Sequence, residues 1–171
     1  MSLFDKAVNQ AMLELAALPN TKFYGQSVRY DGAAIYNSLD GVPMNLRVEM
    51  PVAEDFQFGF CIGKALTGEL PICIYPRMDF MLLCVNQLVN HLDKLPLFGW
   101  HPKIIIRTTV GKKWPLDAGP QHMQNHCEAF QKMLHNVVVR EVRTPEQVAI
   151  AYSLVTMDHR SQLIVENPCL T

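Results

Sequence analysis

Short apolar segments, separated by longer segments with helical periodicity, constrain the fold of this chain more than any other feature of its sequence. Residues 103–109 are mostly β-branched, as residues of buried strands often are. We predict strands at 21–25, 46–50, 71–75, 103–109, 137–140 and 162–166. We predict helices between a Ser2 cap and Pro19, and at 54–67, 79–95, 124–134 and 145–157. This alternation favours an α/β three-layer sandwich, a mainly parallel sheet with helices on both faces.

The loops between these elements indicate where a ligand would bind. No repeat, low-complexity tract or linker divides the chain, so we predict one domain over residues 1–171. Residues 26–43 are predicted as a polar loop with at most one helical turn. Ligands of parallel sheets bind at the carboxyl ends of the strands. The loops that follow residues 75 and 109, and the one that precedes residue 54, should therefore share one edge.

The charge balance and the lengths of the apolar runs argue against nucleic acid and membranes as partners. Fifteen Lys and Arg residues face sixteen Asp and Glu residues, for a net charge of −1. A chain this neutral lacks the positive surface that binds nucleic acid. No apolar run reaches the roughly 18 residues of a membrane span, and the charged first helix is unlike a signal peptide. We expect a cytoplasmic protein that binds neither nucleic acid nor membrane.

Common catalytic and metal-binding motifs are missing from the sequence. It has neither a glycine-rich phosphate loop nor a GxSxG nucleophile motif. Its five cysteines form no CxxC pair and have no zinc-ligand spacing, so we expect reduced, buried thiols and no metal ligands in this chain. These cysteines are Cys61, Cys73, Cys84, Cys127 and Cys169.

Three polar or aromatic positions fall on the predicted edge. Glu54 begins a helix, where the helix dipole ordinarily stabilises a carboxylate; the alternative is a buried carboxyl that its apolar neighbours keep partly protonated and able to exchange a proton with a ligand. Asp79 and Phe80 follow a strand. Either Asp79 is the N-cap of a helix and Phe80 a core residue, or both belong to a site. His122 precedes a helix, as a surface or capping histidine or as a catalytic one.

The order and spacing of several segments resemble one family. The segments are Tyr30-Asp31-Gly32-Ala33, residues 51–68, Asp79-Phe80, Asn86-Gln87-Leu88-Val89-Asn90, Ile106-Arg107, Gly119-Pro120-Gln121-His122 and Leu163-Ile164-Val165-Glu166-Asn167. Together they resemble the pyrimidine-binding domain of thiamine-diphosphate enzymes of the transketolase-like group, above all the beta subunit of pyruvate and branched-chain 2-oxo acid dehydrogenases. The resemblance covers essentially the whole chain and implies the thiamine-diphosphate-binding fold.

The resemblance implies a role for each of the three positions. Glu54 matches the catalytic glutamate that hydrogen-bonds the ring nitrogen of the cofactor's aminopyrimidine and so promotes its reactive tautomer. Phe80 matches the aromatic residue that packs on the pyrimidine. His122 matches the catalytic histidine that faces substrate and donates a hydrogen bond or a proton.

The sequence departs from the family pattern at several positions. Gln26 or Ser27 stands where relatives have an acidic residue, which weakens a proton relay. Pro76-Arg77 precedes Met78, where relatives more often have an aromatic or small residue, and Arg77 alters what enters the site. Further differences are Val52-Ala53, Met123 and the loop Gly111-Lys112-Lys113-Trp114. The two lysines of this loop indicate either an anionic substrate or a solvated loop.

The resemblance also implies a partner chain. The Gly-Asp-Gly segment that binds diphosphate and magnesium in this family is missing from the sequence, and in the family it belongs to another domain. Dehydrogenase beta subunits also continue with a second domain. We therefore expect half of a split active site, with thiamine diphosphate as cofactor and with Mg²⁺ and diphosphate held by an alpha-like subunit. A homodimer or heterotetramer is expected.

Three functions remain open at this point. The first is a split enzyme that cleaves or decarboxylates a 2-oxo acid or ketone donor and transfers the carbanion fragment, as a dehydrogenase, decarboxylase, ligase or transketolase-like protein. The second is a non-catalytic structural or regulatory paralogue, and the third is a stand-alone small-molecule binding domain. The apolar helix predicted at 79–95, with Phe98 and Trp100, is either core or a subunit interface.

Overall fold

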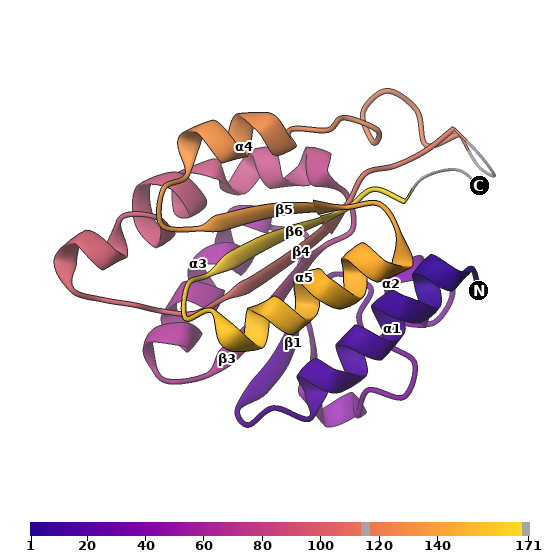
Figure 1. The fold of residues 1–171 in the computed structure, drawn as a ribbon, viewed down its shortest axis with the longest axis horizontal. Coiled ribbons are helices and arrows are strands. Elements are labelled where there is room, and N and C mark those ends of the chain that lie inside the picture. The colour runs from indigo at the N-terminus through magenta and orange to yellow at the C-terminus, as the bar shows by residue number, and fades with distance from the viewer. Residues whose placement is uncertain (114–116, 169–171) are drawn as a thin grey trace.

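Six parallel strands form one sheet at the centre of the computed structural model, which describes residues 1–113 and 117–168 (Figure 1). Their order across the sheet is β2-β1-β3-β4-β6-β5. The strands are β1 (Thr21–Gly25), β2 (Arg47–Glu49), β3 (Leu70–Tyr75), β4 (Ile105–Thr109), β5 (Val138–Val142) and β6 (Gln162–Glu166). The predicted α/β fold is therefore confirmed, and every pairing in the sheet is parallel.

Three helices cover one face of the sheet: α1 (Leu3–Ala16), α2 (Ala34–Ser38) and α5 (Pro145–Met157). Figure 1 shows α1 and α5 side by side in front of the strands. The predicted cap of α1 is confirmed, because Ser2 Oγ accepts the Asp5 N–H at 3.1 Å and Asp5 accepts the Ser2 N–H at 3.0 Å. Pro145 is the first residue of α5, as predicted.

The other face is covered by α3 (Glu54–Leu66), α4 (Cys127–Met133) and three helical segments between β3 and β4. Those segments are η2 (Met78–Cys84), η3 (Gln87–Leu92) and η4 (Leu95–Phe98), and a further turn, η1 (Met44–Leu46), precedes β2. Alternate residues of each strand face opposite layers, so Cys73 and Tyr75 pack under α3 while Ile72 and Ile74 pack under α1.

The prediction of one regular helix at 79–95 is wrong in detail. The segment starts as a 3₁₀ helix at Met78–Cys84 and continues as π-helical turns at Gln87–Leu92. Met78, Met81 and Cys84 are all buried and recur at every third residue. A 3₁₀ helix has three residues per turn, so this winding points all three side chains at the sheet.

The cysteines in the described residues are buried and unpaired, as predicted for Cys61, Cys73, Cys84 and Cys127. Burial raises the pKa of the Cys84 thiol to about 12 and that of Cys127 to about 11. Both thiols therefore stay protonated and unreactive at neutral pH. Cys169 lies outside the described residues.

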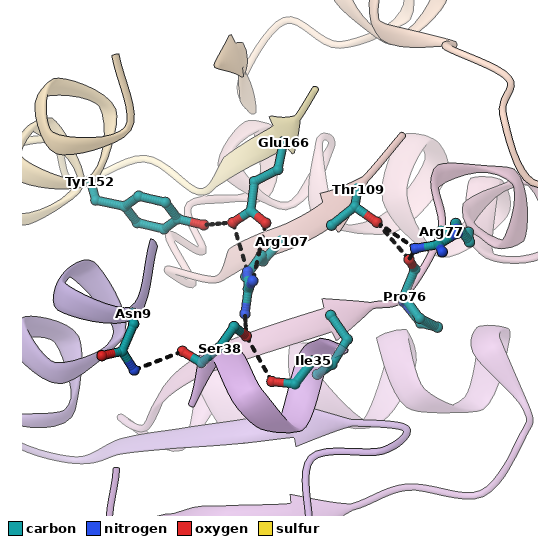
Figure 2. Close-up of polar contacts among 9 residues, drawn as sticks. All are labelled: Asn9, Ile35, Ser38, Pro76, Arg77, Arg107, Thr109, Tyr152 and Glu166. Carbon is teal, nitrogen blue, oxygen red and sulfur yellow. Dashed lines mark hydrogen bonds and ion pairs between the residues drawn. The ribbon is translucent and has the colours of Figure 1, made fainter. Parts of the chain in front are cut away.

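A buried ion pair cross-links the α1 side of the sheet near its carboxyl edge (Figure 2). Arg107 of β4 donates to both carboxylate oxygens of Glu166 of β6, from Nε at 2.7 Å and from Nη2 at 3.0 Å. Arg107 Nη1 donates to Ser38 Oγ of α2 at 2.8 Å, and Tyr152 of α5 donates to Glu166 at 2.9 Å. Burial acts to lower the pKa of Arg107, but the adjacent Glu166 carboxylate outweighs it, and the pKa is raised.

We predict that Arg107→Leu lowers the free energy of unfolding by about 3–5 kcal/mol, because it leaves the Glu166 carboxylate buried without its cation. The matched control is Arg160→Leu. Arg160 pairs with Asp158 on the surface, where its side chain is 57% exposed, and such pairs contribute only about 0–1 kcal/mol. Urea unfolding of both variants measures the difference; equal losses would contradict the prediction.

Candidate functional site

The carboxyl ends of β2, β3 and β4 place the three predicted site residues along one edge of the sheet. Glu54 begins α3 five residues after β2 ends at Glu49. Phe80 lies in η2, just after β3, and His122 lies in the segment between β4 and α4. Because all six strands are parallel, these three connections leave the sheet at the same edge.

Glu54 is buried, with its backbone fixed and one carboxylate oxygen held. Tyr75 donates its hydroxyl to the Glu54 carbonyl at 3.0 Å. Gln26 Nε2 donates to Glu54 Oε1 at 3.2 Å. No described residue forms a hydrogen bond to Glu54 Oε2. The carboxyl group is therefore oriented from one side, and its second oxygen remains available to a ligand.

The turn after β1 brings Gln26 to Glu54, and Glu49 shapes that turn. The Glu49 carboxylate accepts three successive backbone N–H groups, from Ser27 at 2.6 Å, Val28 at 2.9 Å and Arg29 at 3.0 Å. Ser27 has a left-handed backbone, with φ of 59°. Of the two positions that the sequence left open, Gln26 is therefore the one that contacts Glu54.

Glu49 is a positioning residue that the sequence analysis missed. A signal was present, because a glutamate inside a short predicted strand of a covered sheet needs partners for its charge.

Phe80 and His122 are brought into direct contact. Their ring centroids lie 5.5 Å apart and the rings are nearly perpendicular, at 87°, an edge-to-face arrangement that aromatic pairs favour. Both side chains are half-buried.

Two hydrogen bonds hold the segment that carries His122 against η2. The Gln124 N–H donates to Asp79 Oδ1 at 3.3 Å, and the His126 N–H donates to Met78 Sδ at 3.3 Å. The interpretation of Asp79 as a cap of its own helix is wrong, because no side chain caps η2 and Asp79 reaches across to Gln124 instead. The second Asp79 oxygen is buried without a partner among the described residues.

Gly111 allows the His122 backbone to come this close to β4. A Cβ built on Gly111 would lie 2.0 Å from the His122 carbonyl oxygen, far inside van der Waals contact. Only glycine fits at this position, so its lack of a side chain determines where His122 lies.

A cavity of about 650 Å³ opens beside His122, on the α1 side of the edge. Its polar wall includes Arg77, Arg107 and Glu166, and its apolar wall comes from α1 and α2. Lys112, one of the two loop lysines, lines this cavity, whereas Trp114 lies outside the described residues. His122 therefore borders both the Phe80 ring and the cavity.

Neither a metal centre nor a membrane span is found in the part of the chain that the structure describes. Within residues 1–113 and 117–168, no group of three or more His, Cys, Asp or Glu side chains could hold a metal ion. No helix in those ranges is long and apolar enough to cross a bilayer.

The fold and the site define a class of protein, which comparison with known proteins makes more specific. No family model matches the chain. Among solved structures, one described as "Split gene transketolase, inactive beta4 tetramer" matches with a TM-score of 0.71 at 15% identity, over 95% of this chain and 50% of that one. The chain therefore has a transketolase-like fold.

The matching curated relatives are each named pyruvate dehydrogenase E1 component subunit beta. That of Cyanidium caldarium is 36% identical over 93 residues, which are 52% of this chain and 28% of that protein. That of Gracilaria tenuistipitata var. liui is 32% identical over 105 residues, 59% of this chain and 32% of that protein. The chloroplastic beta-3 subunit of Oryza sativa subsp. japonica is 28% identical over 138 residues, which are 77% of this chain and 35% of that protein.

The predicted resemblance to the pyrimidine-binding domain of transketolase-like proteins is thus confirmed. The chain spans about a third of the length of the curated relatives that it matches. One of those relatives is chloroplastic, and the cytoplasmic location expected here stays a prediction.

We predict that Gly111→Ala displaces His122 from the Phe80 ring, because the new methyl group would overlap the His122 carbonyl oxygen. The ring-proton NMR shifts of His122 and Phe80, which depend on how the two rings lie relative to each other, should both change. The control is Gly63→Ala in the exposed part of α3, where a Cβ meets nothing within 4 Å. That variant should leave both rings unchanged; identical spectra for Gly111→Ala and wild type would contradict the prediction.

Proposed function

We propose that residues 1–171 form the pyrimidine-binding, beta-like subunit of a split thiamine-diphosphate enzyme. The observation that carries this proposal is Glu54, a buried carboxyl with one oxygen held by Gln26 and the other available. It lies on the same edge of the sheet as the Phe80–His122 pair. The similarity to pyruvate dehydrogenase beta subunits supports the same function.

The residues present fit an aminopyrimidine ring on two counts. The ring carries nitrogens that need a hydrogen-bonding partner, and Glu54 offers an oxygen that no described residue occupies. The ring also has two flat apolar faces, and Phe80 offers a half-buried aromatic side chain at the same edge. When bound, thiamine diphosphate supplies the carbanion chemistry that cleaves the bond beside a substrate carbonyl.

The residues of this chain divide the remaining tasks. Glu54 holds a proton at the ring nitrogen, and Gln26 keeps its carboxyl group in the orientation that this requires. An amide does not exchange a proton as a carboxyl does, so Gln26 orients Glu54 and relays nothing. His122, at the border of the cavity, offers a ring N–H to the substrate oxygen that becomes negative.

We propose that an alpha-like partner chain holds the diphosphate and Mg²⁺, as the resemblance to beta subunits implies. We propose a 2-oxo acid or ketone donor as substrate. A non-catalytic paralogue is the second candidate, favoured by one observation: the contact to Glu54 comes from the amide of Gln26, where the family has an acidic residue.

We predict that Glu54→Gln lowers turnover of a 2-oxo acid by at least about 100-fold in the complex with the alpha-like chain, because the proton at the ring nitrogen is lost. Calorimetric titration of the complex with thiamine diphosphate, with and without Mg²⁺, measures cofactor binding beside turnover. Glu128→Gln on the exposed side of α4 is the control. Unchanged turnover in Glu54→Gln would favour the non-catalytic paralogue.

We further propose that the chain associates with a second copy through the 78–100 segment. Part of this segment is core, because Met81, Cys84 and Leu88 are buried. Large apolar side chains in the same segment are exposed: Leu82, Leu83, Leu97, Phe98 and Trp100. Interfaces between subunits cover surfaces of this kind, and one solved structure with this fold is described as an inactive beta4 tetramer.

We predict that Leu83→Glu shifts the chain toward monomer, because it places a charge where an apolar contact is proposed. Sedimentation equilibrium at several protein concentrations measures the change in mass. The control is Ile150→Glu in α5, because the Ile150 residue is 59% exposed and Leu83 is 64% exposed. A mass that does not respond to Leu83→Glu would exclude this surface from the interface.

A further inference from the structure

Arg77 is fixed along one side of its guanidinium group. Its Nη1 donates to the Pro76 carbonyl at 2.8 Å and to Thr109 Oγ1 at 3.1 Å. Thr109 donates in turn to the same carbonyl at 2.6 Å, which closes a triangle of hydrogen bonds (Figure 2). No described residue accepts a hydrogen bond from Nε or Nη2 of Arg77. The half-buried side chain is therefore held in place while two of its nitrogens keep open donors.

The buried Arg107 shows what those open donors are suited to bind. Arg107 uses Nε and Nη2 for the two parallel bonds to the Glu166 carboxylate. Arg77 leaves the same two nitrogens open, and Figure 2 shows the two arginines on either side of Thr109. This edge of a guanidinium matches a carboxylate in both spacing and plane. The geometry at Arg77 is that of an arginine–carboxylate pair from which the carboxylate is missing.

Arg77 lines the cavity of about 650 Å³ that His122 borders. The lining of this cavity also includes the apolar side chains of Phe4 and Val8 from α1 and of Ile35 from α2. Cavities of roughly 300–1,000 Å³ hold ligands much larger than a three-carbon acid. A ligand that fills this cavity therefore has an apolar body beside the group that meets Arg77.

The acidic side chains in the cavity wall already have partners. Glu166 is paired with Arg107, and Asp5 accepts the backbone N–H and hydroxyl of Ser2. Asp117 accepts the Gly119 N–H at 2.9 Å. These acids therefore leave the open edge of Arg77 to a ligand.

We propose that Arg77 binds the carboxylate of the substrate and that the substrate is a 2-oxo acid with an apolar side chain larger than that of pyruvate. This inference rests on the proposed function for the identity of the keto acid, and on the geometry alone for the carboxylate and the apolar body. His122 borders the same cavity as Arg77. Thr109 is a positioning residue, because it acts on the substrate only through Arg77.

The test measures binding to the full chain without cofactor, by NMR titration of the backbone amides that line the cavity. The probes are 4-methyl-2-oxopentanoate, pyruvate and the neutral 4-methylpentan-2-one. Each buried methylene is worth about fourfold in affinity, so we expect the branched acid to bind at least about 10-fold more tightly than pyruvate. The ketone, which lacks the carboxylate, should bind more weakly than the branched acid.

Arg77→Gln should weaken binding of 4-methyl-2-oxopentanoate by at least about 10-fold, since charged hydrogen bonds are lost, and leave the ketone unchanged. Arg160→Gln, which removes an exposed arginine from the opposite end of the sheet, is the matched control and should change neither. Thr109→Val keeps the charge of Arg77 and removes one of the two hydrogen bonds of its Nη1, so it should give a smaller loss for the acid alone.

Three results would overturn the proposal. They are an acid affinity that Arg77→Gln does not change, a ketone that binds as tightly as the acid, and no acid binding in the millimolar range. Cofactor titration of the complex separates this proposal from the proposed function. Glu54-dependent binding of thiamine diphosphate without acid binding would reject the role of Arg77 alone, and the converse result would reject the thiamine enzyme while the acid pocket stands.

Discussion

The bidentate pair between Arg107 and Glu166 is the interaction on which the edge of the sheet depends. Two charges removed from water are costly unless every donor and acceptor has a partner. Here Ser38 and Tyr152 occupy the remaining positions, so the pair also ties α2 and α5 to β4 and β6. Asn9 of α1 extends the network to the carbonyl of Ser38. These hydrogen bonds therefore hold in place the elements that carry the polar wall of the cavity.

The alternation of side chains along β4 connects the Arg107–Glu166 pair to Arg77. Arg107 and Thr109 are two residues apart, so both point to the α1 side of the sheet, and the residue between them points to the other. Thr109 then places Arg77 beside the cavity. The two arginines therefore line the same cavity but differ in their partners. The buried Arg107 is paired with the Glu166 carboxylate, whereas the half-buried Arg77 is proposed to bind the carboxylate of a ligand.

His122 connects two environments. On one side it meets the ring of Phe80, on the layer that contains α3 and Glu54; on the other it borders the cavity under α1 and α2. Its place is set by the missing side chain of Gly111 and by hydrogen bonds from its segment to Asp79 and Met78. The proposed function uses His122 as a proton donor, and a position between the Phe80 ring and the cavity suits that role.

The sequence by itself determined the mainly parallel sheet, the bounds of its six strands to within about two residues, and the start of α1 and α5. These features follow from the hydrophobic period and the helix caps, which act over a few residues. It also singled out Glu54, Phe80 and His122, although their roles stay predictions. Only the tertiary structure decided that η2 winds as a 3₁₀ helix, that Gln26 rather than Ser27 meets Glu54, and that Arg77 rests on Thr109. The Gln26–Glu54 and Arg77–Thr109 contacts join residues 28 and 32 positions apart, and no local pattern in the sequence shows which distant groups contact each other in the fold.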